Sequence, residues 1–193
     1  MEYALGIDSA PDSIPGGTGI LLLHPSTGET DRIDTDFFSI DTDAFLVIST
    51  RTTAREVKQK LEYYDVDEST AVILDTLSVE RGYSRRSGNN VHYVSAPDDL
   101  AGIIEHTARF LEKHTGKCRL SVDSVTELAY YAENEDSVFE AMEELLGLLA
   151  EHDAVGLFHL SPEVHDDALV DRYRERFDAT VVLSEDGTVE SEF

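Results

Sequence analysis

Short apolar runs alternate with amphipathic stretches along almost the whole chain, and this alternation constrains the fold more than any other feature of the sequence. The apolar runs are rich in β-branched residues and bounded by turn formers, which predicts strands over 19–24, 44–49, 71–76, 91–95, 118–123, 154–160 and 179–184. Their continuous apolar character is typical of strands covered on both faces, as in a parallel sheet. A helical period of apolar residues predicts helices over 53–63, 98–114, 136–151 and 166–177.

The order of these segments predicts a three-layer α/β domain with helices on both faces of a mostly parallel sheet. A turn at Asp186 and Gly187 predicts that a β-hairpin ends the chain. We find no internal repeat and no long linker in the sequence, so we expect one domain over residues 1–193. In such a fold, ligand sites are expected beyond the C-terminal ends of the strands.

The charge of the chain is strongly one-sided. Forty acidic residues against fifteen basic ones give a formal net charge of −25, and the acidic residues are spread through every segment. Such a surface repels itself at low ionic strength, and molar salt screens that repulsion. Only four lysines are present, namely Lys58, Lys60, Lys113 and Lys117. We interpret this composition as that of a halophilic protein from a salt-rich cytoplasm, with an acidic mesophilic protein as the alternative.

The composition also excludes several classes of protein. Direct binding to nucleic-acid phosphates needs a basic face, which this sequence does not supply. No apolar run approaches the roughly 20 residues that cross a bilayer, and no signal pattern precedes residue 20, so we expect a cytoplasmic protein that does not associate with membranes. Cys118 is the only cysteine, so no intrachain disulfide is possible and we expect a small core residue there.

One loop suggests a phosphate-binding motif. The pattern Gly-x-x-x-x-Gly-Lys-[Ser/Thr] between a strand and a helix cradles phosphates with backbone N–H groups, neutralises them with the lysine and holds Mg²⁺ with the hydroxyl. Over residues 23–30 this sequence keeps the preceding strand, Gly28 and Thr30, but it has Leu23 for the first glycine and Glu29 for the lysine. The alternative is a plain strand-turn-helix connection. The next helix is weakly amphipathic, with Ile33, Phe37 and Ile40 as its apolar stripe.

A second motif lies at the end of another predicted strand. In CRLSVDSVTELAYY, residues 118–131, an apolar strand ends in Asp123 and is followed by Ser124 and a helix. A nucleotide hydrolase places its Mg²⁺-linked acid at such a position. LSVDSVTEL resembles the second ATPase motif of KaiC-type members of the RecA superfamily, and PGGTGILLLHPSTGET resembles their N-terminal strand and phosphate loop in eroded form.

Two further stretches, VHYVSAPDDLAGI and GLFHLSPEVHDDALVDRYRERFDATVVL, resemble segments of compact archaeal members of this group. Those members include archaellum-associated KaiC-like proteins and haloarchaeal single-domain relatives. The resemblance spans nearly the whole chain in order. It implies a three-layer RecA-like fold of the P-loop NTPase type, and a context of archaeal signalling, motility or assembly control.

Three departures from the family pattern affect nucleotide binding and catalysis together. Besides Leu23 and Glu29, the sequence has Thr50 and Arg51 where the family places an acidic pair, one glutamate of which polarises the attacking water. We therefore expect a pseudo-ATPase with a regulatory or scaffolding role, no catalytic residue, and ATP and Mg²⁺ disfavoured as cofactors. The alternatives are an atypical working ATPase and a domain that binds nucleotide without turnover. The positions of the degenerate nucleotide site are Gly28, Glu29, Thr30, Asp123 and Ser124.

Other side chains suggest weaker hypotheses. A metal site could be built from His159, His165, Glu163 and Asp166, but seven histidines in an acid-rich chain produce such neighbours by chance. A hydrolytic triad of Asp123, Ser124 and His159 lacks the Gly-x-Ser-x-Gly turn that presents a nucleophile. We expect neither site. Asp75, at the end of a predicted strand, is expected to cap a helix.

The stretch VERGYSRRSGNN, residues 79–90, concentrates Arg81, Arg85 and Arg86 in a Gly/Ser/Asn-rich loop. Positive charge is rare in this chain, so the loop is a candidate contact for an anion or for another protein, with an ordinary solvated loop as the alternative. If nucleotide no longer joins neighbouring subunits, weak or no self-assembly is expected and another protein becomes the expected partner.

Overall fold

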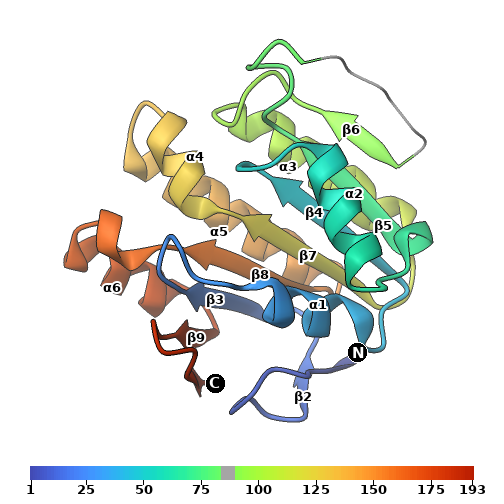
Figure 1. Cartoon of the computed structure of the whole chain (residues 1–193), viewed down its shortest axis with the longest axis vertical. Coiled ribbons are helices and arrows are strands. Elements are labelled where there is room, and N and C mark those ends of the chain that lie inside the picture. The colour runs from blue at the N-terminus through green and yellow to red at the C-terminus, as the bar shows by residue number, and fades with distance from the viewer. Residues whose placement is uncertain (84–89) are drawn as a thin grey trace.

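The computed structural model describes residues 1–83 and 90–193 of the chain. The strands of its main sheet are β3 (Gly19–Leu23), β4 (Ala44–Ser49), β5 (Ala71–Asp75), β6 (Val91–Tyr93), β7 (Cys118–Asp123), β8 (Val155–Leu160), β9 (Ala179–Leu183) and β10 (Val189–Glu192). In the described residues they lie in the order β10-β9-β3-β8-β7-β4-β5-β6 (Figure 1). Every neighbouring pair is parallel except β9 and β10, which form the C-terminal hairpin. The predicted fold is therefore confirmed.

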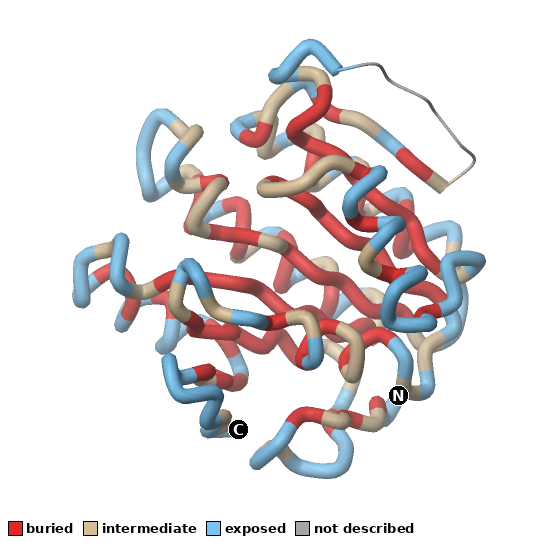
Figure 2. The backbone as a smooth tube through the Cα atoms, in the orientation of Figure 1, coloured by how far each residue is buried: buried red, intermediate tan, exposed pale blue. Residues whose placement is uncertain are grey.

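Helices cover both faces of this sheet (Figure 1). On one face lie α1 (Asp31–Ser39) and α2 (Ala54–Tyr63). On the other face lie α3 (Leu100–Lys113), α4 (Val125–Tyr131), α5 (Glu135–Glu151) and α6 (Asp167–Arg176). Short 3-10 turns precede β5 and follow β8, as η1 (Glu68–Thr70) and η2 (Pro162–Val164). The central strands are buried along their length, which accounts for their continuous apolar sequence (Figure 2).

Local sequence explains where most of the helices begin. Thr53 forms a capping box with Glu56 at the start of α2, and Asp99 and Asn134 accept backbone N–H bonds at the starts of α3 and α5. For α1 the predicted apolar stripe was wrong at one position. Phe38 is buried where Ile40 was expected, because the helix ends at Ser39, so Ile40 lies beyond its last turn.

An N-terminal hairpin of β1 (Glu2–Ala4) and β2 (Ser13–Pro15) was not predicted. Tyr3 anchors it to the main sheet, because its hydroxyl donates to the Asp153 carbonyl and accepts from the Cys118 N–H. The Tyr3 ring also faces the guanidinium of buried Arg119, whose other ring neighbour is Phe37. Burial lowers the Arg119 pKa to about 10 and raises that of Cys118 to about 11.

The topology brings four strand ends together at one edge of the sheet. Chain segments leave β3, β8, β7 and β4 side by side at this edge, on the left of Figure 1. This is where open α/β sheets place their ligand sites. No helix among the described residues is long and apolar enough to cross a membrane.

Candidate functional site at the strand ends

The loop after β3 makes its hydrogen bonds to other parts of the protein. The Gly28 N–H donates to the Pro25 carbonyl at 2.7 Å, and the Ser26 N–H donates to the carboxylate of Glu163 on η2. A side chain at position 28 would bring a Cβ to 2.9 Å from the Pro25 oxygen, which explains the glycine there. Glu29 is exposed. The loop therefore already holds one carboxylate, that of Glu163, at a backbone N–H.

Thr30 comes directly before α1 and is buried. Its hydroxyl does not cap the helix but donates to Asp34 Oδ2 at 3.2 Å, one turn later. The hydroxyl that the resemblance assigned to Mg²⁺ is thus hydrogen-bonded to a carboxylate of the chain.

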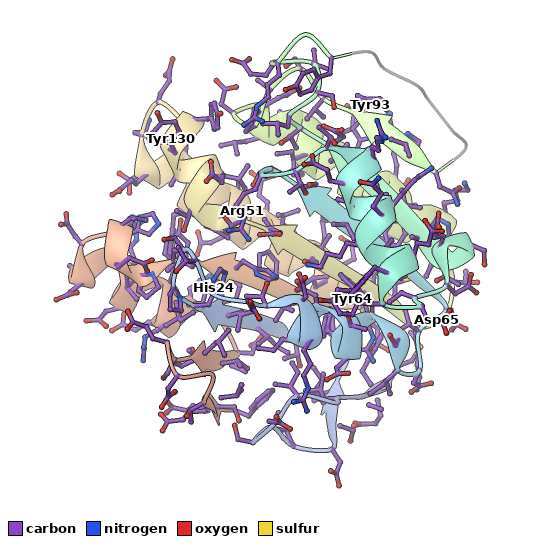
Figure 3. The ribbon with its side chains drawn as sticks, in the orientation of Figure 1. His24, Arg51, Tyr64, Asp65, Tyr93 and Tyr130 are labelled. Atoms are coloured by element: carbon purple, nitrogen blue, oxygen red, sulfur yellow. The ribbon has the colours of Figure 1, made fainter. Side chains whose placement is uncertain are left out.

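Arg51 lies just beyond the end of β4 (Figure 3). Its side chain contacts Asp123, at the end of β7. A guanidinium nitrogen of Arg51 lies 2.8 Å from Asp123 Oδ1, as an ion pair that is not aligned as an ordinary hydrogen bond. Neighbouring Thr50 fixes the backbone here, because its hydroxyl donates to the Asp123 carbonyl and accepts from the Ser124 N–H. The place expected for an acidic pair therefore holds a cation that neutralises Asp123.

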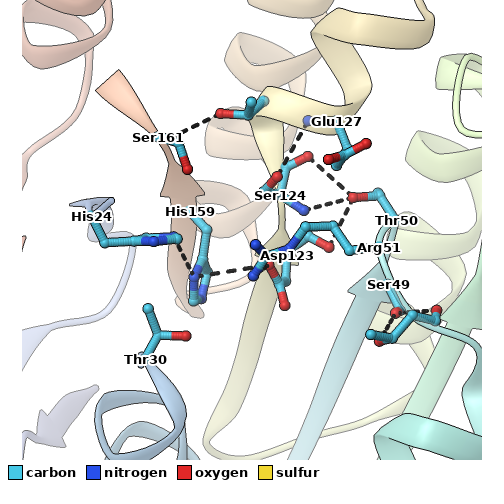
Figure 4. A network of polar contacts seen from close by, with 12 residues as sticks. His24, Thr30, Ser49, Thr50, Arg51, Asp123, Ser124, Glu127, His159 and Ser161 are labelled. Carbon is cyan, nitrogen blue, oxygen red and sulfur yellow. Dashed lines mark hydrogen bonds and ion pairs between the residues drawn. The ribbon is translucent and has the colours of Figure 1, made fainter. Parts of the chain in front are cut away.

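A buried charge network lies behind this pair. His159, on β8, is fully buried, and its Nε2 lies 2.8 Å from Asp34 Oδ1. Lys60, on α2, donates to Asp34 Oδ2 at 2.9 Å and also pairs with Asp31. On its other side, His159 Nδ1 lies 3.3 Å from Nε2 of His24 and 4.0 Å from Asp123 Oδ1 (Figure 4). His159 therefore lies between the Arg51–Asp123 pair and the Lys60–Asp34 pair and contacts both.

The network shifts the pKa values of its members in opposite directions. Burial alone would raise the pKa of Asp34, but the charges of His159 and Lys60, with the hydrogen bond from Lys60, hold it well below its usual value. Burial likewise opposes the charge on His159, yet Asp34, and secondarily Asp123, raise its pKa. Burial and then the neighbouring His159 lower the pKa of His24. We infer a charged His159 that donates from Nδ1 to a neutral His24, whose own Nδ1 donates to the Pro25 carbonyl.

The two weaker hypotheses involve side chains that make other contacts in the structure. Ser124 Oγ accepts from the Glu127 N–H and caps α4, and the peptide bond before Ser124 is cis. His165 contacts Thr126 at 3.0 Å, while Glu163 holds the Ser26 N–H. Within residues 1–83 and 90–193, no three His, Cys, Asp or Glu side chains are arranged to hold a metal ion.

Asp75 has the helix-capping role that its position predicted. Its buried carboxylate accepts from the N–H of Ala54, the first residue of α2, at 2.7 Å. It also accepts from the N–H groups of Leu77 and Ser78 and from the Ser78 hydroxyl. Of the arginine-rich loop, the structure shows an exposed Arg81. Arg85 and Arg86 lie outside the described residues.

Sequence reasoning identified Gly28, Glu29, Thr30, Asp123 and Ser124, and the structure places all of them at this edge of the sheet. It missed Asp34, which accepts from Thr30, and the residues of the network behind it, Lys60 and His24. It also missed the contact between Glu163 and the loop. One available signal was Lys60 itself, because a lysine in so acidic a chain has many carboxylates with which to pair.

Comparison with solved structures shows the same fold in other proteins. A KaiC-like protein of Pyrococcus horikoshii OT3 has a TM-score of 0.68 at 16% identity, covering 94% of this chain and 79% of its own. An ATPase of the type III secretion system of pathogenic bacteria has a TM-score of 0.65 at 16% identity. The match covers 96% of this chain but only 57% of that ATPase.

An uncharacterised P. horikoshii protein, solved with an unknown peptide, has a TM-score of 0.64 at 12% identity, covering 92% of this chain and 83% of its own. These likenesses show a RecA-like fold, as in KaiC-like proteins and ATPases. A comparison with curated protein sequences finds no match. One family model covers residues 1–193, and the chain therefore belongs to the family of unknown function DUF7090.

Proposed function

We propose that this protein is a pseudo-ATPase, a RecA-like domain that acts as a regulatory or scaffolding subunit without binding or hydrolysing ATP. The observation that carries the proposal is the charge network at the strand ends. Arg51 pairs with Asp123, and Asp34 pairs with both Lys60 and His159. Side chains of the protein itself thus engage the positions that would contact Mg²⁺ and phosphate in an active member of this fold.

The residues at these positions do not fit a magnesium–nucleotide complex. A triphosphate would lie beside the exposed carboxylate of Glu29 and compete with Glu163 for the Ser26 N–H. The Thr30 hydroxyl would have to leave its internal partner, and Mg²⁺ at Asp123 would meet the positive charge of Arg51, which is already paired with that carboxylate. Coupling between charges about 4 Å apart is worth about 4 kcal/mol near a protein surface, so exchanging a lysine for Glu29 turns strong attraction into repulsion.

Loss of hydrolysis leaves protein binding as the source of function. The resemblance to KaiC-type proteins supports a context of signalling, motility or assembly control in archaea. Arg81 is exposed on a chain of net charge −25, and it begins the segment that also contains Arg85 and Arg86. A cationic segment on an acidic body selects acidic partners by charge, so we propose this loop as the contact with another protein.

A hydrolysis assay tests the proposal. We expect purified protein with ATP and Mg²⁺, in high salt, to release no phosphate above the buffer rate. Phosphate release by the wild type that Asp123→Asn abolishes would refute the pseudo-ATPase proposal and support the atypical ATPase. Glu29→Lys restores a cation to the loop, but we expect no turnover, because Thr50 and Arg51 still stand where the water-polarising glutamate would be.

The partner contact is tested separately. We expect a variant with alanine at 81, 85 and 86 to recover less partner protein than the wild type in a pull-down at native-like salt. A matched control replaces Arg55, Arg172 and Arg174, which removes the same charge from α2 and α6. Equal recovery by all three proteins would show the loop to be an ordinary solvated connection.

A further inference from the structure

A cavity of about 440 Å³ lies between α1 and α2, over the ends of β4 and β7. Its volume is in the range of small-molecule sites. The apolar part of its wall includes Phe38 on α1 and Val57 and Leu61 on α2. Its floor includes Val47 and Ser121, which face each other in register on the two strands.

Ser121 is the unusual residue of this floor. It is 2% exposed and lies among apolar neighbours, yet its hydroxyl makes no hydrogen bond to any residue in the described parts of the chain. The hydroxyl oxygen itself is not fully enclosed, so it opens into the cavity, where a ligand can reach it. A ligand that bonded the Ser121 hydroxyl would supply the missing partner.

The mouth of the cavity carries an excess of negative charge. The lining has five carboxylates against two cations, namely Glu29, Asp31, Asp34, Glu56 and Asp123 against Arg51 and Lys60. Charged His159 lies behind Asp34, and the carboxylates still outnumber the cations. Asp123 is one-fifth exposed, and only its Oδ1 is engaged by a partner within residues 1–83 and 90–193. Its Oδ2 is therefore available as an acceptor. This charge favours a cationic group on the ligand over an anionic one.

We propose that this cavity binds a small amine with an apolar body and a hydrogen-bonding group at its far end. The ammonium group would pair with Asp123 at the mouth, and the far group would bond the Ser121 hydroxyl at the floor. The two residues lie on the same face of β7 and are two positions apart, about 7 Å along the strand. A substituted aromatic ring matches this separation and the apolar walls.

The proposal rests on the proposed function in one respect, since a bound nucleotide would occupy part of the mouth. It goes beyond that function by giving the regulatory domain a small-molecule ligand. The cavity does not overlap the arginine-rich segment, whose described member Arg81 is not among its lining residues.

Three probes of similar size distinguish the contribution of the ligand's charge from that of its hydroxyl group. They are tyramine, phenethylamine and 3-(4-hydroxyphenyl)propionate. NMR titration of ¹⁵N-labelled protein would follow the amides of Val47 and Ser121. We expect tyramine to bind about fivefold more tightly than phenethylamine, as one added hydrogen bond allows. We expect the propionate, in which a carboxylate replaces the amine, to bind at least about tenfold more weakly than tyramine.

Ser121→Ala should reduce tyramine binding to the level of phenethylamine while leaving phenethylamine binding unchanged. The matched control is Ser161→Ala, which removes another buried serine hydroxyl that does not line the cavity and should change neither affinity. The proposal is overturned if no probe shifts the two amides, if the propionate binds as tightly as tyramine, or if both variants behave alike. Displacement of tyramine by Mg·ATP would instead contradict the proposed function while leaving the amine site established.

Discussion

At the scale of single residues, Asp34 determines the charge balance at the strand ends. Its carboxylate lies between Lys60 and His159 and is almost fully buried. A buried charge is stable only when it is paired, and removal of one partner leaves the other uncompensated. Asp34 therefore keeps both cations charged, and through His159 it is linked to Asp123.

We predict that Asp34→Asn lowers the pKa of His159. In the wild type Asp34 outweighs burial and holds this pKa above the ordinary value of about 6.5. Without the Asp34 charge, burial dominates and the pKa should fall below that value. An NMR titration of the imidazole measures it, and Asp36→Asn, on the same helix beside exposed Arg32, is the control. A His159 pKa that does not change in Asp34→Asn would show that Asp34 does not hold the ring charged.

The same pair predicts how stability depends on pH. A group with a raised native pKa contributes stability that is full below its unfolded pKa and is lost as pH rises through the native pKa. The advantage of the wild type over Asp34→Asn should therefore shrink from about pH 6.5 upward. Because the pKa of Asp34 is lowered in the folded protein, its carboxylate stabilises the fold at neutral pH. That contribution is lost only as the pH falls below about 4. Urea denaturation at a series of pH values measures this difference, and an advantage that grows with pH would contradict the assignment.

At the scale of elements, Asp75 joins the end of β5 to the start of α2. Its buried carboxylate accepts from the first N–H of α2 and from two N–H groups in the turn after β5, so the turn and the helix depend on the same side chain. Sequence could suggest this role because an acid at a strand end is a common cap. It could not show that the capped helix would be α2, which precedes β5 in the chain.

Asp75→Ala should lower the free energy of unfolding by about 3 kcal/mol, because several buried donors lose a charged acceptor together. Asp67→Ala is the matched control, since Asp67 also accepts a backbone N–H but lies exposed at the start of η1, and it should cost much less. Chemical denaturation of both variants gives the comparison. Equal losses would mean that burial of Asp75 adds nothing to its bonds.

The elements differ in how far sequence could predict them. The long strands and amphipathic helices could be predicted because each has an apolar pattern of its own. The hairpin of β1 and β2 could not, because each strand has three residues and Tyr3 is held by contacts far away in the chain. The network around Asp34 could not either, because its burial depends on how α1 packs beside α2 and β8.

At the scale of the whole molecule, the net charge of −25 dominates behaviour in solution. Few cations are available to neutralise it, so repulsion between surface carboxylates should oppose folding at low ionic strength. The melting temperature should therefore rise steeply from about 0.1 M to about 3 M KCl, as the screening length falls from roughly 10 Å to a few Å. A melting temperature that stays flat over this range would contradict a salt-rich native environment.

The RecA-like fold provides the positions of a nucleotide site at the strand ends, whereas the charge network engages those positions with side chains of the protein. The fold places a loop, a hydroxyl and an acid where nucleotide sites occur, and the chain engages each of them internally. The central claim is that these internal partners exclude nucleotide.

Calorimetric titration of the wild type with Mg·ATP in high salt tests this claim most directly. We expect a dissociation constant weaker than about 1 mM, equivalent to a binding free energy of roughly −4 kcal/mol. A micromolar dissociation constant that Asp123→Asn abolishes would contradict the claim and show that the network opens to admit nucleotide.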